Sequence, residues 1–142
     1  MKTYITDFIP WGKTYCFSMD KHDCYYRNKG ICSLRHYKIP YEYIKGIAYN
    51  SKLFCPNLAT SLLQNGFFQA TDDVKIHKKE CGHYEISQGQ HRVCVCARLQ
   101  MPMKVLYQED NDKCRICSVC EYNLKKKICY KLLREQDFLL DL

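Results

Sequence analysis

The 142-residue sequence is poor in glycine and proline and has no long hydrophobic segment. Six glycines and four prolines are too few for a collagen-like or linker-like chain. No apolar run approaches the roughly 18 residues that a transmembrane helix needs. The first nine residues also lack the apolar core of a signal peptide. These absences predict a soluble, cytoplasmic protein that has no membrane partner.

The composition contains enough apolar residues to form a folded core. Hydrophobic residues make up 46% of the chain and aromatic residues 13%, which is enough apolar surface to offset the loss of chain entropy. The formal net charge is +7. A positive balance of this size permits an anionic partner such as a nucleotide or DNA, but it does not require one.

Cysteine is the residue type that departs most from an ordinary composition. The chain has 11 cysteines, and this odd number excludes a complete set of intramolecular disulfides. In a cytoplasmic protein, metal ligands or reduced thiols are expected instead, and many free cysteines act simply as small buried hydrophobic residues. Cys16, Cys24 and Cys32 recur with seven residues between neighbours, which is not a typical spacing for zinc ligands.

Three segments follow one another along the chain within one compact unit. Residues 1–50 have poor periodicity and predict an irregular lobe, with short strands at Thr3–Ile9 and near Tyr41–Ile47. Residues 51–107 carry the clearest patterns and form the predicted core. Residues 108–142 predict a cysteine-rich knuckle followed by a C-terminal helix.

The middle segment predicts an α/β (α+β) fold, a small mixed sheet with short helices. Asn57 is a candidate cap for the first helix, and Gly66 is its stop. The expected elements are a helix over Pro56–Gly66, strands at Val74–His77 and His83–Ser87, a helix over His91–Leu99 and a strand at Met103–Tyr107.

A glycine loop, Gln88-Gly89-Gln90, precedes the second predicted helix, which opens with His91-Arg92. Glycine allows a tight turn from strand into helix, and the first helical turn leaves several N–H groups unpaired. Together with the helix dipole these groups form an anion site, and arginine can bind a phosphate with two parallel hydrogen bonds. Physical reasoning leaves two interpretations open, a phosphate site or an ordinary helix start with Arg92 on the surface.

These residues resemble a family signature. Tyr84–Val93, followed by Ala97–Leu99 and Pro102–Val105, resembles the signature box of the ParB/sulfiredoxin superfamily. Its members have a strand, a glycine followed two residues later by His-Arg or Arg-Arg, an apolar helix, and a strand introduced by proline. Leu58–Gln69 is similar to the first helix of the family. The resemblance covers about residues 50–107.

The resemblance implies a fold that binds a nucleotide such as CTP or ATP, with Mg²⁺. ParB proteins bind and hydrolyse CTP while acting on DNA, and sulfiredoxins use ATP to repair an over-oxidised cysteine. The implied nucleotide- and phosphate-binding residues are Ser87, Gly89, Gln90, His91 and Arg92. Gln90 stands where sulfiredoxins have their nucleophilic cysteine, which disfavours sulfiredoxin activity.

The resulting hypothesis is a ParB-like nucleotide-binding protein that acts as an NTP hydrolase or a switch in DNA transactions. Glu85 is the candidate catalytic acid. Strand alternation places it on the face of Ser87, where it is either within reach of a metal-bound phosphate or simply solvated. Two alternatives remain: a ParB-like nuclease or phosphotransferase, in which Glu85 or Asp72 would hold Mg²⁺, and a non-catalytic zinc-knuckle binding module.

A second motif consists of Cys114-x2-Cys117-x2-Cys120, with Cys129 after eight more residues. Two-residue gaps allow thiolates to converge on one tetrahedral Zn²⁺ ion, with Cys129 or an outside ligand completing the site. Reduced thiols and an iron–sulfur cluster are the alternatives, although the fourth ferredoxin cysteine normally follows after three residues. Cys81-x-His83 offers two outside ligands, but such a pair is also typical of a simple turn.

Overall fold

The computed structural model of the chain describes residues 2–36, 38–66, 72–124 and 137–142. It has a mixed α/β fold, as the sequence predicts. In chain order the elements are β1 (Lys2–Phe8), β2 (Thr14–Ser18), α1 (Tyr25–Lys29), α2 (Ser33–His36), α3 (Phe54–Asn65), β3 (Lys75–Lys78), β4 (Tyr84–Gln88), α4 (Gln90–Arg98), β5 (Met103–Glu109), α5 (Arg115–Leu124) and β6 (Asp137–Asp141).

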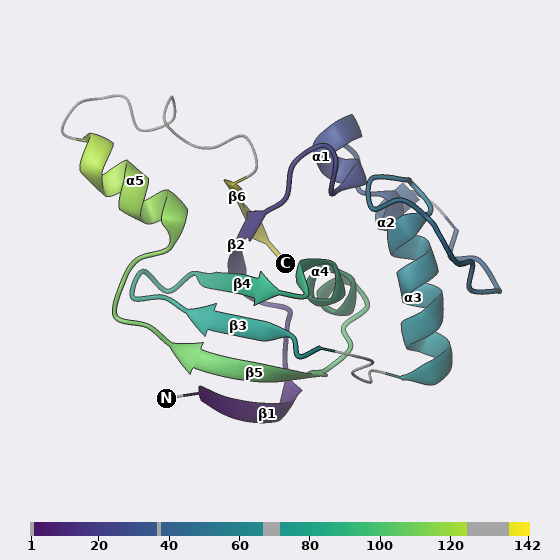
Figure 1. Cartoon of the computed structure of the whole chain (residues 1–142), viewed down its shortest axis with the longest axis horizontal. Coiled ribbons are helices and arrows are strands. Elements are labelled where there is room, and N and C mark those ends of the chain that lie inside the picture. Colours follow the sequence, from purple (N-terminus) through teal and green to yellow (C-terminus); the bar gives the residue numbers. More distant parts are fainter. Residues whose placement is uncertain (1, 37, 67–71, 125–136) are drawn as a thin grey trace.

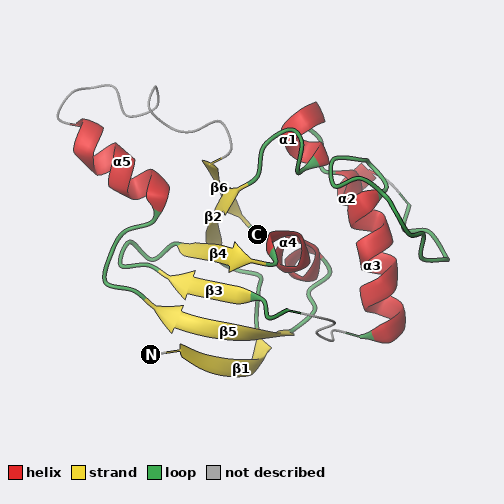
Figure 2. Ribbon diagram, in the orientation of Figure 1, coloured by secondary structure: helices red, strands yellow, loops and turns green. Residues whose placement is uncertain are grey.

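One six-stranded sheet organises the molecule, in the order β1-β5-β3-β4-β2-β6. The pairs β3–β5 and β2–β4 are parallel, and the other three pairs are antiparallel. Figure 1 shows the short helices α1 and α2 with α3 at one end of the sheet and α5 at the other. Figure 2, in which helices are red and strands yellow, shows that helices lie at both ends of the sheet.

Both faces of the sheet are covered at strand β2. Because neighbouring side chains of a strand point to opposite faces, Tyr15 and Phe17 share one face and Cys16 lies on the other. Tyr15 and Phe17 are fully buried in the main core, which includes Val93 of α4. Cys16 is also fully buried and packs in a smaller cluster with Ile116 of α5. The sheet therefore separates an α4 face from an α5 face.

Most of the expected elements are present near their predicted bounds. The elements β1, α3, β3, β4, α4 and β5 correspond to the strands and helices that the sequence patterns predict. The sequence patterns do not predict strands β2 and β6 or helices α1, α2 and α5. The amphipathic pattern after Leu124 and the Phe67-Phe68 pair lie outside the described residues.

The strand predicted near Tyr41–Ile47 is wrong, because side chains of α3 satisfy the backbone of this segment. Asn57 accepts a hydrogen bond from the Ile44 N–H (2.6 Å) and donates one to its carbonyl (2.8 Å). Gln64 donates to the carbonyl of Tyr41 (2.6 Å). Asn57 is therefore not the cap of α3, which begins earlier, at Phe54. Its buried amide holds the preceding loop instead.

No helix within the described part of the chain has the length and apolar character needed to cross a membrane.

Candidate functional site

A pocket of about 490 Å³ lies at the N-terminus of α4. Its wall includes the end of β2 and the segment after it, the start of α3, and the glycine loop that the sequence singles out. The lining residues are Ser18, Met19, Asp23, Tyr49, Phe54, Leu58, Gly89, Gln90, His91 and Arg92. Four of the five predicted phosphate-binding residues therefore line one cavity. The fifth, Ser87, is exposed on β4, with its hydroxyl 3.1 Å from Nε2 of His77.

Gly89 makes the turn into α4 with a φ of 92°. A Cβ at this position would lie 2.8 Å from Cγ2 of Val74, which is closer than packed carbon atoms approach. The first hydrogen bond of the helix runs from the Val93 N–H to the Gly89 carbonyl (3.0 Å). The N–H groups ahead of Val93 are those that a helix start leaves without an intrahelical acceptor. This local geometry is the one that the glycine loop predicts.

The side chains of the loop already have partners in the protein. Gln90 accepts a hydrogen bond from the Ser18 N–H (2.6 Å) and donates one to the Ser18 carbonyl (3.1 Å). Arg92 donates to the carbonyl of Asp72 (3.1 Å) and lies 3.4 Å from its carboxylate. The amide of Gln90 thus connects α4 to the end of β2, and Arg92 contributes a cation to the lining of the pocket.

His91 forms part of an aromatic group at the mouth of the pocket. Its ring stacks on Tyr49, with centroids 5.7 Å apart and an interplanar angle of 10°, and meets Phe54 edge-on at 4.8 Å. Burial lowers the pKa of His91, which favours the neutral ring. His91 therefore supplies aromatic surface here rather than a second positive charge.

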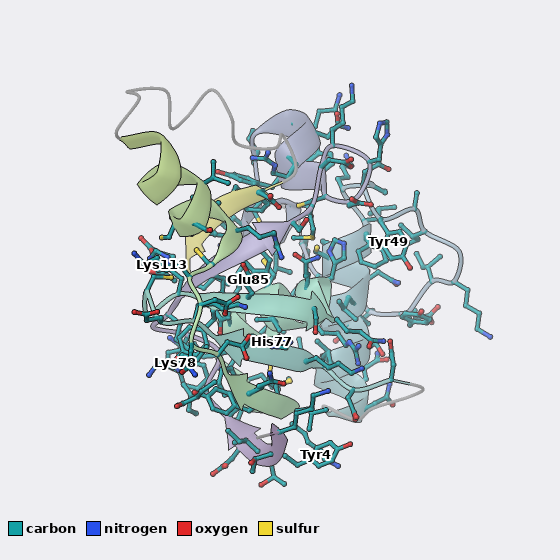
Figure 3. The ribbon with its side chains drawn as sticks, turned by 60° about the vertical axis from the view of Figure 1, so that its left-hand side comes forward. Tyr4, Tyr49, His77, Lys78, Glu85 and Lys113 are labelled. Atoms are coloured by element: carbon teal, nitrogen blue, oxygen red, sulfur yellow. The ribbon has the colours of Figure 1, made fainter. Side chains whose placement is uncertain are left out.

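Glu85 lies on the α5 face of the sheet, away from this pocket. In Figure 3 Glu85 is labelled near the centre, toward α5, whereas Tyr49, which lines the pocket, lies at the right of the view. The side chain is buried and accepts hydrogen bonds from the Arg115 N–H (2.6 Å) and guanidinium (3.2 Å). The Lys79 ammonium lies 3.8 Å from it. The expectation that Glu85 is solvated is therefore wrong. Its hydrogen bonds to Arg115 hold the start of α5 against the sheet.

A second group of functional side chains forms where the β3–β4 turn meets the loop before α5. Cys81, His83, Cys114 and Cys117 place their ligand atoms within 4.8 Å of one another, close enough to hold a metal ion. Nδ1 of His83 lies 3.5 Å from the sulfur of Cys114 and 3.3 Å from that of Cys117. The Glu80 N–H donates to the Asp112 carbonyl (2.8 Å), which joins the two loops directly.

Backbone and side-chain donors surround the sulfurs of this cluster. The Cys114 N–H points to the sulfur of Cys81, and the Cys117 N–H to that of Cys114, both at 3.4 Å. A hydrogen bond with Cys16 lowers the pKa of Cys114, and the same contact raises the pKa of Cys16. The environment thus favours a thiolate at Cys114, the form that binds metals.

The sequence-predicted metal ligands divide into two groups. Cys114 and Cys117 belong to the cluster. The Cys120 side chain and Cys129 lie outside the described part of the chain. Cys81 and His83 supply the outside ligands that the sequence offered as one way to complete the site. Cys81-x-His83 lies in the turn between β3 and β4 and also belongs to the cluster. Its two interpretations, a simple turn and a pair of metal ligands, are therefore compatible.

Comparison with known proteins identifies no relative of this chain. No family model matches it, and neither a curated protein nor a solved structure is significantly similar. The interpretation of both sites therefore depends on their geometry and chemistry.

Replacing Gly89 by alanine is expected to lower the free energy of unfolding by about 2–5 kcal/mol. The substitution combines a positive φ, which costs about 1–2 kcal/mol, with a clash against Val74 that costs about 1–3 kcal/mol. Gly12→Ala is the matched control, since Gly12 has a φ of 74° and a Cβ added there would meet nothing within 4 Å. Urea unfolding of both variants checks this, and equal losses would contradict the clash.

Glu85→Gln is expected to lower the free energy of unfolding by about 1–3 kcal/mol, because it weakens the anchor of Arg115. The partial exposure of Arg115 favours the lower end of this range. Glu42→Gln, in an exposed loop, should stay within about 0.5 kcal/mol of the parent. Chemical denaturation measures both variants. An unchanged stability for Glu85→Gln would argue against an anchoring role.

Proposed function

We propose that the chain is a zinc-binding protein in which Cys81, His83, Cys114 and Cys117 hold one Zn²⁺ ion. The observation that carries the proposal is the convergence of their four ligand atoms within 4.8 Å. Three thiolates and one imidazole are a standard ligand set for structural zinc. Four protein ligands leave no open position for a substrate, so the role of the ion is structural.

The distances support a tetrahedral ion. Zn–S bonds of about 2.3 Å and Zn–N bonds of about 2.0 Å separate neighbouring ligand atoms by roughly 3.5–3.8 Å. The two distances from Nδ1 of His83 to sulfur, 3.3 and 3.5 Å, are close to this range. The backbone N–H groups that point at Cys81 and Cys114 would fix the sulfurs in place, as outer hydrogen bonds do around metal ligands.

The ion would join two parts of the chain that lie far apart in the sequence, in addition to the backbone contact between Glu80 and Asp112. Cys81 and His83 lie in the β3–β4 turn, whereas Cys114 and Cys117 lie at the start of α5. Metal-binding energy becomes folding energy when no site exists in the unfolded chain. Zinc would therefore fasten α5 to the sheet beside the Glu85–Arg115 contact.

Cys81→Ser is expected to remove one equivalent of zinc per chain and to lower the melting temperature. Cys96→Ala is the control, because Cys96 is buried in α4 and belongs to the other face of the sheet. Native mass spectrometry counts the bound metal. Full zinc content in Cys81→Ser, together with a loss in Cys129→Ser, would overturn this ligand set in favour of the one that the cysteine spacing alone suggests.

A second candidate function is nucleotide binding in the pocket at the start of α4. The supporting observation is that Gly89–Arg92, the helix N-terminus and the aromatic rings of Tyr49 and Phe54 line the same 490 Å³ cavity. N–H groups and an arginine suit phosphates, and aromatic rings suit a base. With the ParB/sulfiredoxin resemblance, this favours CTP or ATP with Mg²⁺, in an NTP hydrolase or a switch acting on DNA.

The ion pair between Arg92 and Asp72 has to change before a nucleotide can bind in this pocket. Arg92 would have to exchange its contact with Asp72 for a phosphate, or Mg²⁺ would have to neutralise Asp72 and leave Arg92 in place. The nuclease or phosphotransferase alternative has less support, since Glu85 is engaged by Arg115 on the other face of the sheet.

A nucleoside triphosphate at ten times its Kd is expected to stabilise the chain by about 1.4 kcal/mol, a shift of a few degrees in melting temperature. Arg92→Ala should abolish this shift, and Lys104→Ala, on the exposed side of β5, should preserve it. A thermal-shift series of CTP and ATP, each with and without Mg²⁺, makes the measurement. No shift of the parent at millimolar nucleotide would refute the candidate.

A further inference from the structure

Four cysteines that are far apart in the sequence meet where the N-terminal segment packs against α3 and α4. Cys24 directly precedes α1, Cys32 directly precedes α2, Cys55 lies in the first turn of α3 and Cys94 lies within α4. All four line one small enclosed cavity of about 20 Å³. This volume is close to that of a single water molecule or ion by the same kind of measure. The cavity is separate from the Cys81 cluster, which lies on the other face of the sheet.

The polar groups around this cavity are incompletely satisfied. The hydroxyl of Ser33 and Nε of Arg98 both belong to cavity-lining residues. They are two of the three buried side-chain polar atoms that lack a hydrogen-bond partner in the described part of the chain. Ser33 is only 4% exposed. Buried unpaired donors are rare and often mark an ion or water that belongs in the site.

The thiols affect one another electrostatically. Burial is the main cause that raises the pKa of Cys55, and the charges of Cys24, Cys32 and Cys94 raise it further. Burial also raises the pKa of Cys94 to about 11, while the charge of Arg98 and a hydrogen bond from its guanidinium to Cys94 act in the opposite direction. The imidazole Nδ1 of His91 lies 3.9 Å from the sulfur of Cys55. The cavity therefore brings together four sulfurs, an imidazole and a guanidinium.

We propose that Cys24, Cys32, Cys55 and Cys94 form a second metal site, which takes a soft divalent cation such as Zn²⁺. On binding, each thiol releases its proton to solvent and forms one metal–sulfur bond. Four thiolates around a divalent ion carry a net charge of −2, which Arg98 partly neutralises. Ser33 and Arg98 then donate their unpaired hydrogens to the sulfurs, as the outer partners of metal ligands do.

The alternative is that the four thiols are ordinary core residues, since free cysteine is among the most buried residue types. Packing alone explains their burial, but it leaves the Ser33 hydroxyl and Nε of Arg98 without acceptors. A metal site supplies both acceptors and also accounts for the cavity. Within the described residues, only the Cys81 cluster has every ligand atom within 4.8 Å of the others. The second site therefore has to contract around its ion.

The elements that carry these cysteines are suited to such a contraction. Helices α1 and α2 have only five and four residues, so a small displacement of either breaks few backbone hydrogen bonds. Bound metal would supply stability that such short helices lack. The site would also reach the nucleotide pocket, because His91 lines both cavities.

The test is the zinc content of the full-length chain, purified without chelator and counted by native mass spectrometry. The parent is expected to carry two zinc ions. Cys55→Ser and Cys81→Ser should each carry one, and the double variant none. Cys96→Ala, on the same helix as Cys94, should keep both. One zinc in the parent that Cys81→Ser removes and Cys55→Ser leaves in place would overturn the second site while preserving the first.

Cobalt titration of the metal-free parent provides a measurement that does not depend on how a variant folds. Two equivalents should bind, each with the sulfur-to-cobalt charge-transfer absorption of thiolate ligands. The Cys94-containing site should give the stronger band, because four sulfurs rather than three bind the ion. Saturation at one equivalent, or a second equivalent without thiolate absorption, would overturn the proposal.

Discussion

The burial of β2 on both faces is the constraint on which the rest of the structure depends. Its three central residues are fully buried, Tyr15 and Phe17 against the α4 side and Cys16 against the α5 side. β2 lies inside the sheet, with β4 and β6 as its two neighbours, and both of its faces are covered. Ser18 at its end holds Gln90, so the same strand positions both the pocket and the cluster.

Because successive side chains of a strand point to opposite faces, the polar and apolar residues of one strand lie on different faces of the sheet. On β4, Tyr84 and Ile86 point to the main core, whereas Glu85 and Ser87 point to the other side. Glu85 therefore meets Arg115 and cannot serve a pocket at the start of α4. The pocket at the start of α4 and the cysteine–histidine cluster are thus separated by the sheet, and each depends on a different set of loops.

The cysteines show how local spacing differs from spatial proximity. Cys114 and Cys117 are paired by a two-residue gap and remain together in the structure, while Cys81 and His83 join them from more than 30 residues away. Cys24 and Cys32 have a spacing that does not suggest metal binding, yet they share a cavity with Cys55 and Cys94. Their common location depends on contacts between segments that are distant in the sequence, which no local spacing predicts.

The sequence by itself determined the α/β class, the helices and strands from α3 to β5, and the glycine turn at Gly89. These features depend on side-chain periodicity and on backbone conformations that few residues allow, both of which are local. Only the tertiary structure decided the partners of Glu85, the loop held by Asn57, the edge position of β6 and the convergence of Cys81 and His83 with Cys114 and Cys117. These depend on contacts between distant segments, whose geometry is set by how the sheet and helices pack together.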